Sequence, residues 1–202
     1  MRKQGKVKFV LGVTGSFASG KSTVAKLFCA KDRQLIDADK IAHACLDSDK
    51  AVRDKVVAAF GRKITGPGGR IRRRALGKIV FSDKAALGKL NRIMHPVLKR
   101  LISGRIKASK KKIIILDAAL IVEAGLKGWL DKLVVVKAGR NQQALRGGKK
   151  FSLSQKDALA RIKSQSSIRE KSRLADFIID NSGTLQQTKK QVAEIRRKLW
   201  KS

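Results

Sequence analysis

Short, uniformly apolar runs alternate along the chain with longer segments in which apolar residues recur every three or four positions. Uniformly apolar runs are typical of strands buried on both faces of a sheet, and the spaced segments are typical of amphipathic helices. The runs predict strands at residues 8–13, 34–39, 112–117, 132–139 and 176–183. The alternation therefore predicts an α/β fold, in which helices cover both sides of a parallel sheet.

Helical spacing fills most of the chain between these runs. The expected helices are 20–30, 39–60, 72–81, 83–107, 154–173 and 184–200. The fourth of them is expected to be interrupted near Pro96, because proline removes a helix hydrogen bond. Two polar, glycine-containing segments, 61–70 and 145–154, are predicted to be loops, the second a flexible break. Since residues 62–107 contain no candidate strand, we interpret them as a helical excursion between the second and third strands.

The 202 residues suffice for one domain with a sizeable core, and a hydrophobic content of 43% argues against disorder. No apolar run approaches the roughly 20 residues of a membrane span, and the apolar stretch near the N-terminus is too short for a signal peptide. We therefore expect a cytoplasmic protein without a membrane segment. Cys29 and Cys45 lack partners at metal-ligand spacing, so we interpret them as reduced, mostly buried thiols.

The net charge adds a possible partner that the hydrophobic pattern does not indicate. The chain has 48 Lys and Arg against 15 Asp and Glu, a formal net charge of +33, which attracts polyanions whatever the fold. The charge fits a nucleic-acid-binding protein, and it also fits an enzyme that acts on phosphate-rich substrates. The densest basic clusters, 70–74 and 109–113, are short, and tyrosine is absent, so a base-stacking surface is poorly supplied. We favour a solvated basic surface with incidental affinity for RNA.

The segment GSFASGKS, residues 15–22, fits the pattern G-x-x-x-x-G-K-[ST]. It follows the first expected strand and opens the first expected helix. A phosphate-binding loop requires this arrangement, because its backbone N–H groups and the helix N-terminus face phosphate oxygens. Lys21 is then expected to reach the β- and γ-phosphates of ATP, and Ser22 to hold Mg²⁺. The alternative is a turn of small residues that binds no ligand.

Acidic residues end two of the expected strands. Asp117 ends the third, where a carboxylate can bind Mg²⁺, and the alternative is that it caps a helix. Asp37 and Asp39 end the second, where a carboxylate can orient an attacking hydroxyl and accept its proton. An acceptor that was already a phosphate would need arginines instead, so this acid favours an alcohol acceptor. Asp39 is equally compatible with a role as the N-cap of the following helix.

The sequence around Arg146 and His95 indicates their roles less specifically than the phosphate-loop motif does. Arg146 opens the second polar segment, and in small kinases a mobile lid in this region brings cations over the transferring phosphate and excludes water. A plain surface loop is equally compatible with the segment. His95, which precedes Pro96, is interpreted as a packed or helix-terminal histidine.

Taken in order, these segments resemble the dephospho-coenzyme A kinase family over nearly the whole chain. The resemblance is carried by VTGSFASGKSTV (13–24), IDADKIAH (36–43), RRALGKIVFSDKAALGKLNRIMHPV (73–97), LDAALIVEAGL (116–126), QALR (143–146), RIKSQ (161–165) and ADFIIDNSG (175–183). It implies a P-loop NTPase fold of the nucleoside-monophosphate-kinase-like class, with a three-layer α/β/α core and a five-stranded parallel sheet. The core would comprise residues 1–45, 112–142 and 174–202, the helical CoA-binding lobe about 46–111, and the lid about 143–173.

The resemblance also implies a reaction, in which ATP phosphorylates the 3′-hydroxyl of dephospho-CoA to give CoA and ADP, the final step of CoA biosynthesis. It implies that Asp39 is the catalytic base, assisted by Lys21 and Arg146, and that Asn181 lies near the adenine. The implied nucleotide-binding residues are Gly15, Ala18, Ser19, Gly20, Lys21, Ser22, Thr23 and Asn181, and the implied Mg²⁺ ligands are Ser22 and Asp117. Another P-loop kinase with an alcohol or nucleoside acceptor and a basic nucleic-acid-binding protein are the alternatives.

The chain departs from the family pattern at several positions. Ala18 stands where the family loop usually has glycine, so its methyl group is expected to crowd the loop or to resist a positive φ. Ala119 replaces a usual proline, which is expected to loosen that loop. Arg72 replaces a common aspartate, and Lys150 replaces a common lid arginine, keeping its charge without its planar fork. The adjacent glycines at 147–148 are expected to raise the entropy of the lid.

Overall fold

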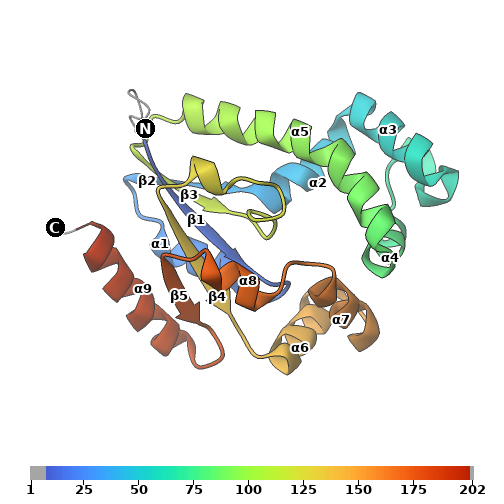
Figure 1. The fold of residues 1–202 in the computed structure, drawn as a ribbon. Coiled ribbons are helices and arrows are strands. Elements are labelled where there is room, and N and C mark those ends of the chain that lie inside the picture. The colour runs from blue at the N-terminus through green and yellow to red at the C-terminus, as the bar shows by residue number, and fades with distance from the viewer. Residues whose placement is uncertain (1–7, 201–202) are drawn as a thin grey trace.

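The structure is a computed structural model that describes residues 8–200. Five strands form one sheet: β1 (Phe9–Gly15), β2 (Arg33–Asp37), β3 (Ile113–Asp117), β4 (Lys132–Lys137) and β5 (Phe177–Asp180). Their order across the sheet is β2-β3-β1-β4-β5, and every neighbouring pair is parallel. Each connection between parallel strands must cross over the sheet, and these crossovers place helices on both faces (Figure 1). The expected α/β fold with a five-stranded parallel sheet is confirmed.

The helices that cover the sheet meet it through two apolar layers. The helices are α1 (Lys21–Phe28), α2 (Ala38–Ser48), α3 (Lys50–Phe60), α4 (Arg73–Ser82), α5 (Lys84–Ala108), α6 (Arg140–Phe151), α7 (Gln155–Lys163), α8 (Ile168–Arg173) and α9 (Leu185–Leu199). Three short 3₁₀ turns lie at η1 (Arg62–Ile64), η2 (Pro67–Gly69) and η3 (Lys127–Trp129). Phe28 of α1 and Val192 of α9 pack on one face of the sheet, and Ile41 of α2 and Ile102 of α5 pack on the other.

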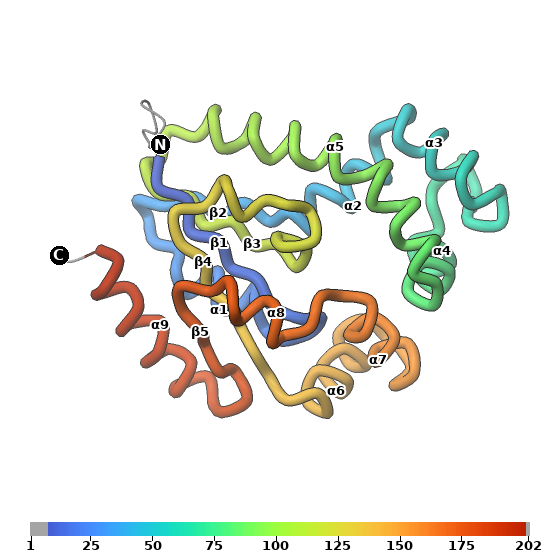
Figure 2. The backbone as a smooth tube through the Cα atoms, in the orientation of Figure 1, coloured from blue at the N-terminus to red at the C-terminus, as the bar shows by residue number. Residues whose placement is uncertain are grey.

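A separate apolar cluster lies in the segment between β2 and β3. It joins α2, α3, α4 and α5 around Val56, Leu76 and Met94. We call α3–α5 the lobe and α6–α7 the lid. Figure 2 shows α3 and α4 of the lobe and both lid helices beyond the same end of the sheet, and α7 packs against α4. The lobe contributes no strand to the sheet, so the expected helical excursion is confirmed.

Two segments that were expected to break helices are helical. α5 runs through Pro96 without interruption. The buried Met94 and Ile102 lie on either side of this proline, and their packing outweighs the hydrogen bond that it removes. α6 continues through Gly147 to Phe151, so the flexible break expected at 145–154 is wrong over most of its length.

Two segments that were expected to be single helices are divided instead. The segment 39–60 divides at Asp49, whose side chain accepts a hydrogen bond from the Val52 N–H and caps α3. The segment 154–173 divides after Lys163, and Ser167 and Glu170 form a capping box at the start of α8. In both places a polar side chain satisfies the backbone and starts a new helix although the apolar spacing continues.

The structure also tests the expectations about membrane spans and cysteines. No helix among residues 8–200 combines the length and apolar character needed to cross a bilayer. Cys29 and Cys45 are both free thiols, and burial was expected for both. Only Cys45 is buried, whereas Cys29 is partly exposed.

Candidate active site

The loop between β1 and α1 is shaped as an anion-binding site. α1 begins at Lys21, and Gly20 at its N-cap has φ 89°, with no side chain capping the helix. Within residues 8–200, the backbone N–H groups of Ala18 and Gly20 have no hydrogen-bond acceptor. Because a helix start without a cap leaves several N–H groups unsatisfied, this loop is able to bind phosphate oxygens.

Two glycines of the loop are required by close packing. A Cβ at Gly15 would collide with the Val136 carbonyl oxygen and the Ser19 hydroxyl, and a Cβ at Gly20 would collide with the Asn181 amide. Asn181 is buried, and its Nδ2 donates to the Ser19 carbonyl at 2.8 Å. This amide therefore supports the loop from the end of β5. The adenine contact expected of Asn181 stays a prediction.

Ala18 adopts a positive φ of 56° in this loop. A Cβ in the left-handed region clashes with the backbone and costs about 1–2 kcal/mol. The strain expected from this departure is therefore present in the loop that would hold the nucleotide.

Replacing Ala18 with glycine should relieve that strain. We expect the free energy of unfolding in urea to rise by about 0.5–1 kcal/mol, since glycine's extra entropy in the unfolded chain offsets part of the gain. Ala85→Gly in the first turn of α5 is the control, and there the same change should destabilise by up to about 1 kcal/mol. An A18G protein no more stable than the wild type would contradict strain at this position.

Three charged side chains meet beside the loop. Lys21 Nζ lies 2.6 Å from Asp39 Oδ2 and 3.5 Å from Asp117 Oδ1. Burial is the largest single influence on the pKa of Lys21 and lowers it, but Asp39, Asp117 and Asp37 together outweigh burial and raise the pKa. The ammonium group is therefore charged and lies between two carboxylates. The structure thus brings together Lys21, Asp39 and Asp117, which the sequence places far apart.

Asp117 is buried at the end of β3, and neither of its carboxylate oxygens has a hydrogen-bond partner within residues 8–200. Burial raises the pKa of Asp117, and the Lys21 ammonium and the Ser22 hydroxyl only partly oppose this effect. No helix starts directly after Asp117, so the interpretation of this residue as a helix cap is wrong. A buried carboxylate beside a serine hydroxyl has the oxygen-ligand chemistry that Mg²⁺ prefers.

Asp37 and Asp39 have different local roles. Asp37 is the N-cap of α2, because its side chain accepts a hydrogen bond from the Lys40 N–H at 2.9 Å. Asp39 lies in the first turn of α2, and the interpretation of Asp39 as the cap is wrong. Its carboxylate is 45% exposed, and within residues 8–200 its hydrogen-bond and ion-pair partner is the Lys21 ammonium, so part of it is open to an incoming hydroxyl group.

Hydrogen bonds tie the loop after β3 to β1 and to α8. The Ala119 carbonyl accepts hydrogen bonds from Thr14 Oγ1 at 3.1 Å and from Lys171 Nζ at 2.7 Å, and the loosening expected from the loss of a proline here stays a prediction. Lys171 is fully buried and forms an ion pair with Glu123 at 3.1 Å. Burial lowers the pKa of Lys171, and Glu123 opposes this effect. Sequence analysis missed both residues, because a lysine in a short polar helix is normally exposed.

The lid rests on the phosphate loop through Phe17. The ring of Phe17 lies 5.2 Å from that of Phe151, and its backbone N–H donates to Gln165 Oε1 at 2.8 Å. Arg146 is inside α6, and its guanidinium donates to the Asn181 carbonyl at 3.1 Å. Arg146 therefore lies on a helix that continues past it, and it does not open a loop. Sequence analysis assigned no role to Phe17, and its position inside the loop motif was the only available signal.

Arg72, Lys150 and His95, which the sequence analysis singled out, lie outside the cluster of Lys21, Asp39 and Asp117. Arg72 is the N-cap of α4 but makes no capping hydrogen bond, a bond that an aspartate could make. Lys150 is exposed, with its ammonium 5.3 Å from the ring centroid of Phe151. His95 lies inside α5, so it is a packed and not a helix-terminal residue. Burial lowers the pKa of His95, an effect that Lys99 reinforces.

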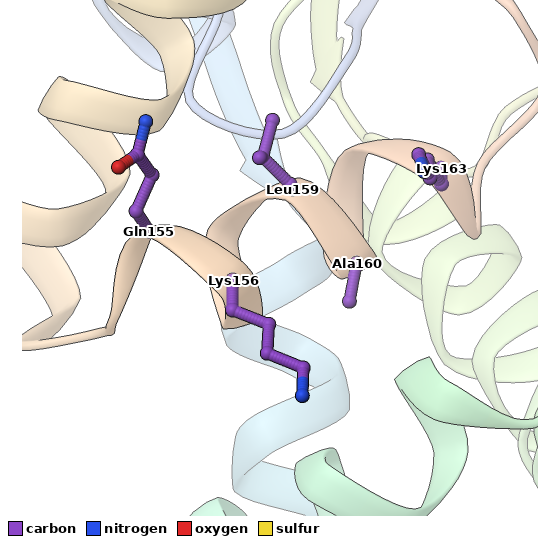
Figure 3. Close-up of a pocket in the computed structure, with 5 residues that line it drawn as sticks. All are labelled: Gln155, Lys156, Leu159, Ala160 and Lys163. Carbon is purple, nitrogen blue, oxygen red and sulfur yellow. The ribbon is translucent and has the colours of Figure 1, made fainter.

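A hollow along α7 lies outside this cluster of charges. Figure 3 shows the side chains that line it, which all belong to α7: Gln155, Lys156, Leu159, Ala160 and Lys163. It includes no residue of the phosphate loop and neither catalytic carboxylate candidate. We therefore locate the candidate active site at Lys21, Asp39 and Asp117 and not at this hollow.

Comparisons with known proteins agree with this geometry. A family model described as dephospho-CoA kinase matches residues 9–187. The curated dephospho-CoA kinase of Latilactobacillus sakei is 37% identical over 93% of this chain and 94% of its own length. That of Arabidopsis thaliana is 38% identical over 94% of this chain and 85% of its own length.

Solved structures give the same result for the fold. TT1252 from Thermus thermophilus has a TM-score of 0.78 and 28% identity, covering 96% of this chain and 98% of its own. The dephospho-CoA kinase from Campylobacter jejuni has a TM-score of 0.66 and 29% identity, covering 95% and 97%. A shikimate kinase from Acinetobacter baumannii, at 11% identity, has a TM-score of 0.53 over 97% and 95%, which is a likeness of fold alone.

Proposed function

Because the chain belongs to the dephospho-CoA kinase family, we propose that it transfers the γ-phosphoryl group of ATP to the 3′-hydroxyl of dephospho-CoA. The products are CoA and ADP, and the reaction is the final step of CoA biosynthesis. One observation in the structure supports an alcohol acceptor above all. The half-exposed carboxylate of Asp39 lies 2.6 Å from the ammonium of Lys21 at the phosphate loop, so a base is placed where an attacking hydroxyl would meet the phosphate.

The transfer is a single displacement at phosphorus. The 3′-oxygen of the acceptor forms a bond to the γ-phosphorus while the bond from that phosphorus to the β,γ-bridging oxygen of ATP breaks. The acceptor's proton passes to the carboxylate of Asp39. ATP phosphates compete with Asp39 for the Lys21 ammonium, and the carboxylate that they displace becomes available to orient the hydroxyl.

Ser22 and Asp117 are the residues that would hold Mg²⁺. The buried carboxylate of Asp117, whose Oδ1 lies 3.5 Å from the Lys21 ammonium, and the adjacent Ser22 fit this ion, which usually takes few protein ligands and completes its shell with water and phosphate oxygens. When bound, the ion neutralises charge on the β- and γ-phosphates. Consistent with so few ligands, the described residues contain no cluster of three or more His, Cys, Asp or Glu able to hold a metal alone.

The other parts of the molecule have supporting roles in this proposal. The nucleotide would bind at Gly15, Ala18, Ser19, Gly20, Lys21, Ser22, Thr23 and Asn181. Arg146 would bring its remaining N–H groups to the nucleotide when the lid is closed. The core at 1–45, 112–142 and 174–202 would carry ATP, the lobe at about 46–111 would receive the CoA part of the acceptor, and residues 143–173 would form the lid.

The test is incubation of the protein with Mg²⁺, ATP and dephospho-CoA, followed by chromatographic detection of CoA and ADP. We expect stoichiometric formation of both products. A folded protein that binds ATP but forms no CoA would contradict the proposal. A parallel panel of nucleosides and other alcohols, scored by ADP release, distinguishes this reaction from that of another P-loop kinase.

The net charge of +33 supports a second, non-catalytic property, which is electrostatic association with RNA. We expect binding to single-stranded RNA to weaken by at least about 10²-fold between about 50 and 200 mM salt, because it depends on counterion release. Filter binding of two RNAs of equal length and unrelated sequence measures this. Binding that selects one sequence and survives the higher salt would favour a dedicated nucleic-acid-binding function instead.

A further inference from the structure

Arg161 of α7 lies where the lid, the phosphate loop and the lobe meet. Its guanidinium carbon is 5.4 Å from the ring centroid of Phe17 and 4.7 Å from that of Phe81. Phe17 belongs to the phosphate loop, and Phe81 belongs to α4 of the lobe. One lid side chain therefore contacts both the element that would hold the donor and the element on the acceptor side.

The guanidinium of Arg161 has no anionic partner in the part of the chain that the structure describes. Within residues 8–200 it donates no hydrogen bond and forms no ion pair, although it is half-buried. Burial lowers the pKa of Arg161, and the only carboxylate that opposes this effect is Asp157. Arginine carries five N–H donors, and here none of them is used by the described part of the chain although the side chain is held between two rings. This arrangement points to a ligand with several acceptor oxygens.

The lobe leaves room for this side chain. A Cβ at the buried Gly77 would lie 3.3 Å from Nη2 of Arg161, so the absence of a side chain there allows the guanidinium to approach α4. Both rings lie within cation–π distance of the guanidinium and contact it without using its N–H donors. The guanidinium is thus held in place while its N–H groups remain available.

Three other cations near the site each have a partner already or are exposed to solvent. Lys21 contacts Asp39 and Asp117, and Arg146 donates to the Asn181 carbonyl. Lys150 is exposed and lies over Phe151. Among these four cations, only Arg161 combines partial burial with a complete set of unused donors.

We propose, on the basis of the function proposed above, that Arg161 is a further catalytic residue whose guanidinium binds the oxygens of the phosphoryl group in transfer. That group moves from the phosphate loop toward the acceptor, and Arg161 lies at the junction of the loop and the lobe. Charge on its oxygens is stabilised best by a planar fork of donors in a site from which water is excluded. Its contacts with Phe17 of the loop and Phe81 of the lobe hold it at this junction.

Kinetics of matched variants test this assignment. We expect Arg161→Met to lower kcat by about 10²-fold and Arg161→Lys by about 10-fold, with both KM values within about 3-fold of the wild type. Arg169→Met, at an exposed arginine of α8, is the control and should leave kcat within about 2-fold. A kcat of R161M within about 3-fold of the wild type would overturn the proposal. So would an effect confined to KM for dephospho-CoA, which would assign Arg161 to the acceptor's diphosphate.

A binding measurement separates this proposal from protein stability and from the proposed function. Aluminium fluoride with Mg²⁺ and ADP mimics the phosphoryl group in transfer and needs no acceptor, so it reports on Arg161 even if dephospho-CoA is not a substrate. We expect fluoride to tighten ADP binding to the wild type and to R169M, but not to R161M, while ADP alone binds all three equally. Fluoride-dependent tightening that is unchanged in R161M would overturn the proposal. R161K, which keeps the charge between the rings, should show intermediate tightening and guards against misfolding of R161M.

Discussion

Replacing Asp39 with asparagine is expected to lower kcat by at least about 10²-fold while the Kd of ATP changes little. An amide cannot accept the proton of the 3′-hydroxyl, but it occupies the same volume in the first turn of α2. ATP affinity should persist, because the phosphates bind the loop and the Lys21 ammonium, which loses only a competing partner at 2.6 Å. The measurements are steady-state CoA formation and calorimetric titration with ATP.

Asp37→Asn is the matched control for this experiment. Asp37 lies two residues away and caps α2, and asparagine caps helices about as well as aspartate. We therefore expect kcat of D37N within about 3-fold of the wild type. Asp39 would lose its assignment as the base if D39N kept a comparable kcat, or if both variants lost activity equally.

Replacing Lys21 with methionine should have the largest effect, lowering kcat by about 10³-fold and weakening ATP binding at the same time. It also changes the stability of the free protein. Asp117 is buried and Asp39 is half-exposed, and without the ammonium the two carboxylates face each other unpaired. We expect the free energy of unfolding to fall by about 2 kcal/mol at pH 7, less than for a fully buried pair because water screens Asp39.

The stability loss in K21M should depend on pH in a defined direction. Burial raises the pKa of Asp117, and losing the nearby cation raises it further. A carboxyl group whose pKa is higher in the folded state binds more protons when folded, so it destabilises as pH rises through its pKa. The deficit of K21M in urea unfolding should therefore shrink from pH 7 toward pH 5. Lys26→Met, at an exposed lysine of α1, should show neither the kinetic loss nor this pH dependence.

The strands and the phosphate loop could be predicted because their signals are local. A run such as residues 112–117 is apolar at every position, which indicates burial on both faces, and the loop motif specifies both its glycines and its lysine within eight residues. The helix ends could not be predicted as well. α5 passes Pro96 because Met94 and Ile102 are buried on either side, and α6 passes Gly147 because the lid packs on Phe17. Those contacts join segments that are far apart in the sequence.

In the candidate site, too, some residues could be predicted from local sequence and others could not. Lys21, Asp39 and Asp117 could be proposed from their places at strand ends, because parallel strands bring their carboxyl ends to one edge. The cap of α2 could not be assigned, since Asp37 and Asp39 are both good capping residues and only the first helical residue distinguishes them. Lys171 gave no usable signal, and Arg161 was marked only as part of RIKSQ (161–165), without a role. A lysine or arginine in a polar helix has the same sequence pattern whether it is exposed or buried.

The lid is anchored to the core at both of its ends, and this limits how it can move. At its start, Arg146 and Gln142 bond the backbone at 181–182, and at its far end Gln165 bonds the Phe17 N–H. Beyond α7, the buried Lys171 forms an ion pair with Glu123. A swinging motion of the whole lid would break all these bonds together, so opening the site in this way carries the combined cost of losing them.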